Sequence, residues 1–305
     1  MTAPVHLGLD VGGSSIKIVA VDPDGTVLRH DRLEIDPRRH PAEAAERVAA
    51  RVADLAPATI GIGSAGTIDA AAGVVLESPN LPGWSGVAVR DLFSTSLGRP
   101  LAIDNDANCA AIGEHWLGAG RGARSVVVVT LGTGIGGGIV LEDRIWRGAS
   151  GTAGEIGHVP ILADGGPPCP CGSRGCLETL ASATAIVRLA GERLAAGEAS
   201  RIRPGAFTAQ DVAAAARAGD DLARRVMESA GRHLGIGLAV LVNLVNPERV
   251  VLVGGLAGAW DLLEDSTRRA LSRAAFRRPV AAVSVVLGTL GELAGAIGAA
   301  RLGML

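Results

Sequence analysis

Two stretches of the chain share one pattern and decide the fold class: HLGLDVGGSSIKIVAV at residues 6–21 and VVVVTLGTGIGGGIVL at residues 126–141. In each stretch an apolar strand runs into a glycine-rich turn, and a second apolar strand returns from it. After the first stretch, residues 22–25 (Asp-Pro-Asp-Gly) predict a further hairpin turn. A strand, glycine loop and strand unit that occurs twice predicts two related domains. Each domain would present one loop to a shared cleft.

The second loop also fits the dinucleotide-binding pattern Gly-x-Gly-x-x-Gly at Gly132, Gly134 and Gly137. That pattern requires a helix directly after the glycines, whereas this sequence predicts a hairpin, so we do not expect a Rossmann site. Lys17 is followed by Ile18, which excludes a Walker A loop. Glycine-rich hairpins bring backbone N–H groups to phosphates, but each loop alone is equally typical of an ordinary tight turn.

Helix and strand patterns alternate along the rest of the chain. This alternation predicts an α/β architecture with functional sites at the carboxyl ends of strands. Strands are expected at residues 58–63, 100–104 and 249–253. Helices are expected at residues 41–55, 107–117, from Thr208 with a capping box, at 222–244 and at about 292–302.

Length and charge bound the class of protein. A chain of 305 residues predicts two domains, which we place at residues 1–107 plus 289–305 and at residues 108–288. The net charge of −2 gives no indication of a nucleic-acid or anionic membrane partner. The start of the chain resembles no secretion signal and no uncharged run is typical of a membrane span, so we expect a cytoplasmic protein.

Three cysteines and a histidine gather in one short segment. His158, Cys169, Cys171 and Cys176 form a complete Cys3His set for a structural zinc ion. The spacing Cys-x-Cys-x4-Cys is tighter at its start than is usual for zinc sites. The alternative is three reduced free cysteines in a loop rich in glycine and proline, an arrangement that would invite oxidation.

Carboxylates stand at two of the predicted strand ends. Asp106 follows the strand at residues 100–104, where it could act as a general base or merely cap the next helix, and the spacing favours neither. Asp10 ends the first strand and could hold Mg²⁺ directly or through water. Glu155, His158 and Glu178 offer acceptors and an imidazole suited to the neighbouring hydroxyls of a sugar.

Seven motifs together resemble the ROK family of sugar kinases, over essentially the whole chain and with the bacterial glucokinases nearest. They lie at residues 10–17, 78–84, 104–108, 131–138, 155–158, 169–176 and 254–255. The pairing of Glu-x-Gly-His with Cys-x-Cys-Gly-x-x-Gly-Cys-x-Glu is highly specific. The resemblance implies an actin-like, ribonuclease-H-like α/β fold of two domains with a central cleft for ATP and sugar.

The resemblance also implies roles for individual residues. Asp106 matches the catalytic base for the sugar 6-hydroxyl, and the sugar contacts match Gly66, Asn80, Asn105, Asp106, Glu155, His158 and Glu178. The contacts to ATP and Mg²⁺ match Asp10, Gly12, Gly13, Ser15, Lys17, Thr133, Gly134, Gly136, Gly254 and Gly255. The zinc ligands match His158, Cys169, Cys171 and Cys176, so His158 is expected to serve both the metal and the sugar.

These observations predict an ATP-dependent kinase that converts glucose to glucose 6-phosphate, with Mg²⁺, a structural zinc ion and a homodimeric or homotetrameric assembly. N-acetylglucosamine, N-acetylmannosamine and fructose are alternative acceptors. Two departures from the family pattern are Ala65, where proline is common, and Ser14-Ser15, where Thr-Lys or Thr-Asn is more usual. The second departure somewhat resembles polyphosphate-using glucokinases and makes polyphosphate an alternative donor.

Two functions without catalysis compete with this interpretation. A ROK-type sugar-sensing repressor requires an N-terminal winged helix, which we do not expect because the first glycine loop begins at Asp10. A catalytically silent sugar-binding module would need neither Asp106 nor the two glycine loops.

Overall fold

The computed structural model describes residues 3–203 and 205–305, which form two compact units. Unit 1 contains the chain up to Val128 together with Gly138–Gly154 and Gly288–Leu305, and unit 2 contains Val129–Gly137 and Glu155–Leu287. The predicted domain boundaries after residues 107 and 288 stay a prediction. The two units group residues that lie close together in space, and such a grouping need not follow the boundaries of evolutionary domains. No helix among the described residues is both long enough and apolar enough to cross a membrane.

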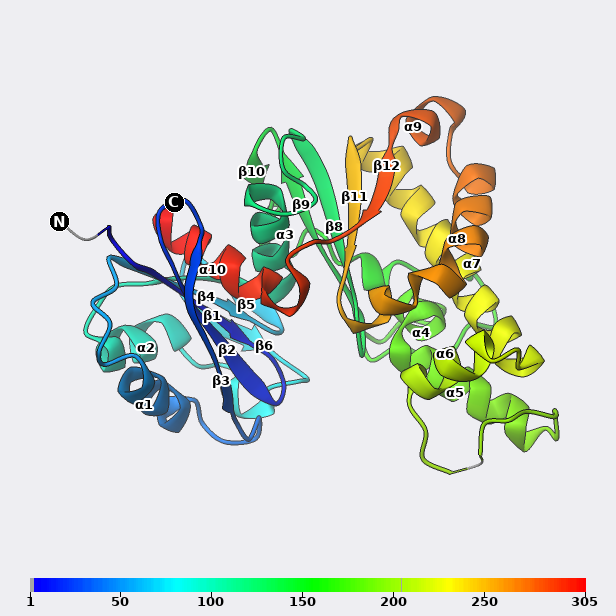
Figure 1. Ribbon diagram of the computed structural model, residues 1–305, viewed down its shortest axis with the longest axis horizontal. Helices are drawn as coiled ribbons and strands as arrows, with labels where there is room; N and C mark the ends of the chain where they lie inside the picture. Colours follow the sequence, from blue (N-terminus) through cyan, green and yellow to red (C-terminus); the bar gives the residue numbers. More distant parts are fainter. Residues whose placement is uncertain (1–2, 204) are drawn as a thin grey trace. The chain divides into compact units, whose positions relative to one another are not determined.

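Unit 1 is built on a five-stranded sheet (Figure 1). Its strand order is β3 (Val27–Glu34), β2 (Ser15–Val21), β1 (His6–Val11), β4 (Thr59–Ser64) and β7 (Ala102–Asn105). Strand β1 pairs with β2 antiparallel, as the predicted hairpin requires, while β1, β4 and β7 run parallel. The carboxyl ends of these three strands therefore meet at one edge, where the first glycine loop and Asn105 lie.

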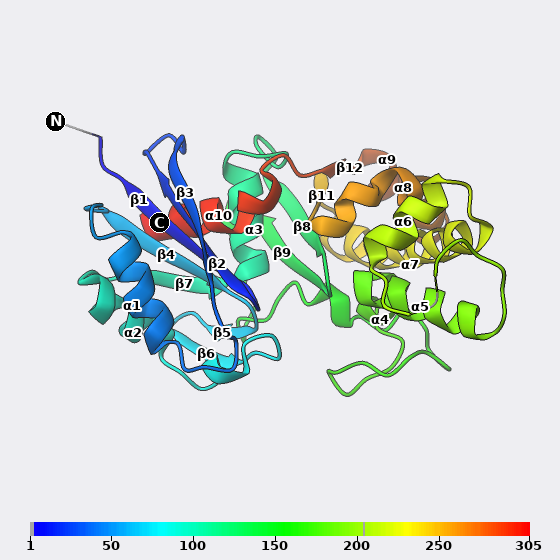
Figure 2. The same ribbon diagram turned by 60° about the horizontal axis from the view of Figure 1, so that its bottom comes forward.

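Strand β1 shows how the two faces of this sheet are used. Leu7, Leu9 and Val11 enter the core formed with α1 (Ala42–Arg51) and α2 (Val89–Leu97). Gly8 and Asp10 alternate with them and face α10 (Ala294–Met304) on the other side (Figure 2). The alternation of apolar residues in β1 thus places Asp10 at a buried strand end beside a helix.

Helix α10 reaches the sheet and α3 (Asp106–Trp116) through small residues. A Cβ atom on Gly61 would overlap the carbonyl of Ala299, and one on Gly298 would overlap the carbonyl of Cys109. The backbones therefore approach one another more closely than side chains allow. This packing holds α3, with Asp106 at its first position, against α10, which packs in turn on the sheet of unit 1.

Smaller elements complete unit 1. Strands β5 (Thr67–Asp69) and β6 (Val74–Glu77) form a two-stranded sheet, and the short β10 (Arg144–Ile145) pairs with β9. A 3-10 turn, η1 (Pro82–Trp84), buries Trp84 against Phe93 of α2, with ring centroids 5.8 Å apart. Strand β3 follows the hairpin turn predicted at residues 22–25 and pairs antiparallel with β2, whereas no sequence pattern predicted α2, β5, β6 or β10.

The second sheet has the order β10, β9 (Ile135–Leu141), β8 (Ser125–Leu131), β11 (Arg249–Val253) and β12 (Ser284–Leu287). Strands β8 and β9 are neighbours joined by a short glycine turn, which confirms the second predicted hairpin. Strand β11 matches the predicted residues 249–253.

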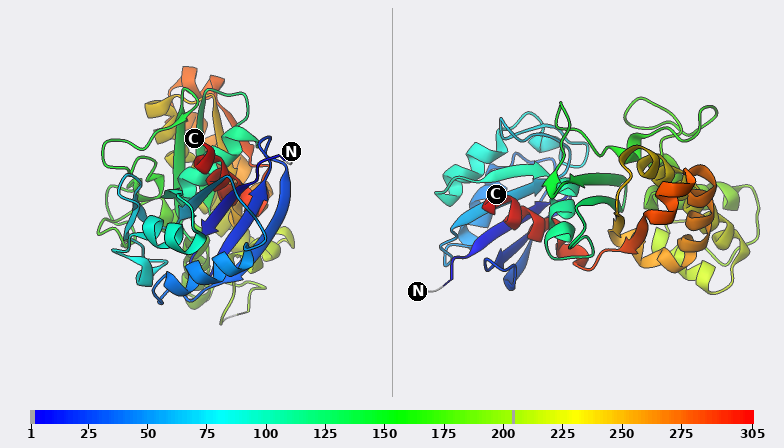
Figure 3. Two further views of the ribbon diagram at one scale, coloured as in Figure 1. Left: turned by 90° about the vertical axis from the view of Figure 1, so that its left-hand side faces the viewer. Right: turned by 90° about the horizontal axis from the view of Figure 1, so that it is seen from above.

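The helices of unit 2 gather around one long helix, α7 (Asp221–Val245) (Figure 1, Figure 3). Its neighbours are α4 (Glu178–Ala181), α5 (Ala183–Ala195), α6 (Ala209–Arg217), α8 (Trp260–Ala274) and α9 (Arg277–Ala282). The capping box predicted at Thr208 is confirmed, because Thr208 and Asp211 bond each other's backbone N–H groups. The helix predicted at residues 41–55 ends earlier than expected, at Arg51.

Candidate active site and metal centre

Asp106 is the first residue of α3, and Asn105 caps that helix. Oδ1 of Asn105 accepts hydrogen bonds from the N–H groups of Ala107 and Asn108, at 2.8 and 3.2 Å. Asp106 accepts from the N–H of Ala107 at 2.9 Å. The alternative in which Asp106 serves as the N-cap is therefore wrong, since that position belongs to Asn105.

Asn105 also joins two of the predicted sugar contacts. Its Nδ2 donates to the carbonyl of Gly66 at 2.9 Å. Gly66 has a φ of +109°, and a Cβ there would lie 2.6 Å from Cβ of Ser78, so this bend requires glycine. Unit 1 thus brings Gly66, Asn105 and Asp106 together at the end of β7.

A buried ion pair supports this turn. Asp104 is 2% exposed, and Nε and one terminal nitrogen of Arg147 each lie 2.7 Å from its Oδ2. Its Oδ1 accepts from the N–H of Asn105 at 2.8 Å and from Nδ2 of Asn108 at 2.9 Å. Arg147 was not predicted from the sequence, because it lies 43 residues from its partner and belongs to no recognisable motif.

The first glycine loop lies at the end of β1. The N–H of Gly12 donates to the carbonyl of buried Ser15 at 3.0 Å, and a Cβ on Gly13 would lie 3.2 Å from the carbonyl oxygen of Asn80. These contacts bring Gly12, Gly13, Ser15 and the predicted sugar contact Asn80 into one region of unit 1.

Asp10 and Lys17 form an ion pair directly beneath this loop. Nζ of Lys17 lies 3.2 Å from Oδ2 of Asp10. Burial raises the pKa of Asp10, while the charge and hydrogen bond of Lys17 oppose that rise. A buried carboxylate next to a phosphate-type loop offers the hard oxygen ligand that Mg²⁺ prefers, so the residues present fit that ion.

The second glycine loop is held by hydrogen bonds within unit 2. The N–H of Gly132 donates to the carbonyl of Gly134 at 3.0 Å, and the N–H of Gly136 donates to the hydroxyl of Thr130 at 3.0 Å. The N–H of Ile135 donates to Oε2 of Glu178 at 2.9 Å. Glu178, expected at the sugar, therefore contacts the loop expected to hold phosphates.

Gly254 has a structural reason to be glycine. Its φ is +94°, and a Cβ would lie 2.5 Å from the carbonyl oxygen of Leu131, the last residue of β8. A Cβ on Gly255 would meet no atom of the described residues within 4 Å. Gly254 thus contacts the end of β8, the strand that leads into the second glycine loop. The space next to Gly255, on the side where a Cβ would lie, is open.

The predicted zinc ligands converge. Their four ligand atoms lie within 4.8 Å of one another, with 3.4 Å between Sγ of Cys169 and Nδ1 of His158 and 3.8 Å between Sγ of Cys171 and Sγ of Cys176. A tetrahedron with Zn–S bonds of about 2.3 Å and Zn–N bonds of about 2.0–2.1 Å has edges of about 3.5–3.8 Å. The geometry therefore fits a structural Cys3His zinc site.

The cysteine thiols differ in acidity when no metal is bound. Burial raises the pKa of Cys169 to about 12 and also raises the pKa of Cys176. A backbone hydrogen bond from Ser173 lowers the pKa of Cys171. Because zinc binds thiolates, the ion would have to displace protons from the buried sulfurs.

His158 turns its two ring nitrogens to different partners. Nδ1 faces Cys169, while Nε2 lies 3.8 Å from Oε2 of Glu155. A ring bound to metal through one nitrogen is oriented by the partner of the other. This arrangement suits the predicted dual role of His158 and brings Glu155 to the metal centre.

Comparison with known proteins identifies the family. A sequence model of the ROK family matches residues 6–304. The chain belongs to the ROK family. It is similar to the glucokinase of Halalkalibacterium halodurans, with 36% identity over 96% of this chain and 93% of the relative.

Solved structures agree with this assignment. The chain is similar to a ROK family glucokinase from Streptomyces griseus in complex with glucose and AMPPNP, with a TM-score of 0.84, 33% identity and coverage of 98% and 99% of the two chains. It is also similar to the ROK hexokinase from Thermus thermophilus, with a TM-score of 0.83, 36% identity and 98% coverage of both chains. The fold is the actin-like fold of ROK sugar kinases, as predicted.

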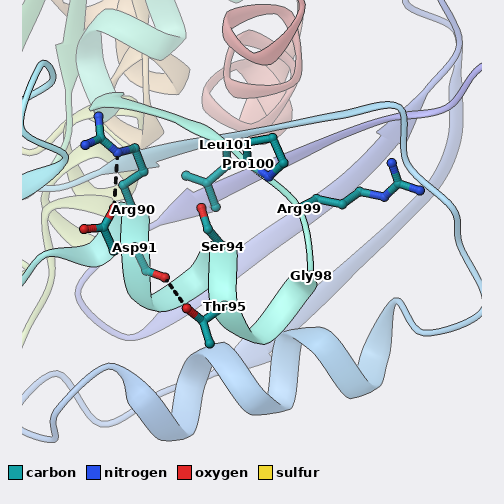
Figure 4. A pocket seen from close by; sticks show the side chains of 8 residues that line it. All are labelled: Arg90, Asp91, Ser94, Thr95, Gly98, Arg99, Pro100 and Leu101. Atoms are coloured by element: carbon teal, nitrogen blue, oxygen red, sulfur yellow. Dashed lines mark hydrogen bonds and ion pairs between the residues drawn. The ribbon is translucent and has the colours of Figure 1, made fainter.

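A pocket of about 460 Å³ lies elsewhere on this ROK protein, between α2 and residues 98–101 (Figure 4). Arg90, which lines this pocket, donates hydrogen bonds to Asp91 and to the carbonyls of Ala71 and Ala72. None of the predicted site residues lines it, so we assign it no part in the function.

The ion pair between Asp104 and Arg147 yields a stability prediction. Arg147→Met leaves a buried carboxylate without its counter-charge. Because Arg147 is itself about one-third exposed, we expect a loss at the lower end of the about 3–5 kcal/mol typical of a broken buried pair. The free energy of unfolding, measured in denaturant, checks this. Arg39→Met, which breaks an exposed pair with Glu43, is the matched control and should change little. Equal losses in both variants would contradict the prediction.

The metal centre yields a second prediction. Purified protein should contain about one zinc ion per chain, and Cys171→Ser should lose both the metal and affinity for sugar, because His158 would no longer be oriented. Elemental analysis and a sugar titration measure the two effects. Cys109→Ala, at a buried cysteine outside the cluster, should keep its zinc. Active protein without zinc would rule out the metal site.

Proposed function

We propose that this protein is an ATP-dependent hexose kinase that converts glucose and ATP to glucose 6-phosphate and ADP. One observation carries the proposal: Asp106 stands at the carboxyl edge of the unit 1 sheet, one residue after the cap of α3 and at the edge that also bears the first glycine loop. That position suits a general base beside a phosphate-binding hairpin. Membership of a family that includes glucokinases supports the same conclusion.

In this reaction Asp106 accepts the proton of the sugar 6-hydroxyl as its oxygen attacks the γ-phosphorus of ATP. The bond from that phosphorus to the bridging oxygen breaks, and ADP leaves. A positioned base contributes about 10²–10⁴ to the rate of such a step. Asn105, held by Gly66, orients the acceptor beside Asp106. We assign the sugar contacts to Gly66, Asn80, Asn105, Asp106, Glu155, His158 and Glu178.

The donor is assigned to the two glycine hairpins. Mg²⁺, when bound, neutralises charge on the transferring phosphoryl group, and Asp10 is the residue that would hold it. Thr133 and Gly134 form the tip of the second loop. We assign donor contacts to Asp10, Gly12, Gly13, Ser15, Lys17, Thr133, Gly134, Gly136, Gly254 and Gly255. His158, Cys169, Cys171 and Cys176 would hold the structural zinc ion.

The finer parts of the proposal are the preferred sugar, the assembly and the location in the cell. Glucose is our expected acceptor, with N-acetylglucosamine, N-acetylmannosamine and fructose as the sugars to compare in a coupled assay. We expect a homodimer or homotetramer in the cytoplasm.

The role of Asp106 is tested by Asp106→Asn. This change removes the base and keeps the size of the side chain, so kcat should fall by at least about 10² while the affinity for sugar changes much less. Steady-state kinetics and a sugar titration separate the two quantities. Asp91→Asn, at an exposed carboxylate on α2, is the control and should leave kcat unchanged. Near-normal kcat in folded Asp106→Asn protein would contradict the assignment.

The donor is tested by comparing ATP with polyphosphate. Gly255 leaves space next to β11 that suits a flat base and that a polyphosphate chain would not need. We therefore expect a higher kcat/KM for ATP than for polyphosphate at saturating glucose and Mg²⁺, despite Ser14-Ser15. A tenfold advantage for polyphosphate would overturn the adenosine role of Gly254 and Gly255 and would leave the role of Asp106 intact.

A further inference from the structure

The second glycine loop is tied to the segment that follows the zinc ligands. The N–H of Ala183 donates to the carbonyl of Gly132 at 2.9 Å, and the hydroxyl of Thr184 donates to the carbonyl of Thr133 at 2.8 Å. The third tie is the hydrogen bond from the N–H of Ile135 to Glu178. Successive residues of the loop are therefore held by residues 178–184 on one side.

Among the described residues of this segment, Glu178 is the one whose side chain accepts a hydrogen bond from the loop. A Cβ atom added to Gly134 would overlap Oε2 of Glu178, the same oxygen that accepts from Ile135. Gly157 closes the other side, because a Cβ there would overlap the carbonyl of Ile135. The loop is thus in close contact with the carboxylate at Gly134 and with the backbone of Gly157 at Ile135.

The residue that precedes Glu178 is tightly packed. Leu177, directly before it, is fully buried, and its N–H donates to the carbonyl of Val159 at 3.0 Å. The side chain of Leu177 packs on α7, where a Cβ on Gly237 would lie 2.5 Å from it. Because Glu178 follows a residue that is packed in this way, its carboxylate can hold the glycine loop in place.

We propose that Glu178 is a positioning residue for the donor loop at residues 132–135. Building on the proposed kinase function, the same side chain then serves the sugar and sets the loop that receives the donor phosphates. Oε2 is occupied by the loop, which leaves Oε1 to accept from a sugar hydroxyl. A residue that contacted sugar alone would have no influence on nucleotide binding in the absence of sugar.

The test compares two substitutions that remove the same charge. Glu178→Gln keeps an oxygen that can accept from Ile135, whereas Glu178→Met has a similar length and no comparable acceptor. Any loss of electrostatic repulsion towards phosphate is common to both. Binding of a non-hydrolysable ATP analogue with Mg²⁺, measured by calorimetry without sugar, should be about five- to tenfold weaker for Glu178→Met than for Glu178→Gln.

Glu155 supplies the matched control. It is also a predicted sugar contact, but it faces His158 rather than the glycine loop. Glu155→Met and Glu155→Gln should bind the analogue equally well within a factor of two. Equal nucleotide affinity in the two Glu178 variants would overturn the proposal.

Hydrogen exchange of the loop amides tests the positioning role of Glu178 without any ligand. Exchange at residues 132–136 should be faster in Glu178→Met than in Glu178→Gln, with the core strand β11 unchanged in both. Wild-type protein that bound no nucleotide would overturn ATP as the donor, while the exchange rates would still decide whether Glu178 holds the loop. Identical exchange in both variants would reject the positioning role.

Discussion

The buried ion pair between Asp104 and Arg147 is the interaction on which the candidate catalytic turn depends. A carboxylate that is 2% exposed would be strongly unfavourable without its counter-charge. Once paired, its other oxygen fixes the N–H of Asn105 and the side chain of Asn108. These two bonds hold the residue that caps α3 and a residue of its first turn, on either side of Asp106. Charge pairing, helix capping and the position of the proposed base form one connected arrangement.

In unit 2, hydrogen bonds rather than a buried ion pair hold the functional loop. Its glycine loop is held by neutral and charge-assisted hydrogen bonds to residues 178–184, and this segment begins two residues after the metal ligand Cys176. A structural metal ion would order the chain immediately before the segment. The order imposed at the cysteine cluster would then pass along the backbone to Glu178 and from there to the loop.

Much of this could be predicted from the sequence, where one local signal was strong. The hairpins at residues 6–21 and 126–141, the long helix α7 and the four converging metal ligands all follow from apolar alternation, helical period or ligand type. Strands β5 and β6 could not be predicted, because they are only three and four residues long and form a separate two-stranded sheet. The contact between Asp104 and Arg147 and the contact between Ile135 and Glu178 each join residues 43 positions apart. No local sequence pattern encodes such a pairing.

Lys17 is the one lysine in the chain, and it lies next to Asp10 beneath the first glycine loop. Arginine supplies all the other basic side chains apart from histidine. Amine-directed chemistry, such as acylation or reductive methylation, therefore has a single side-chain target, besides the α-amino group. A label placed there would report on the surroundings of Asp10 without competing signals from other side chains, and cellular acetylation of lysine side chains would act at this position alone.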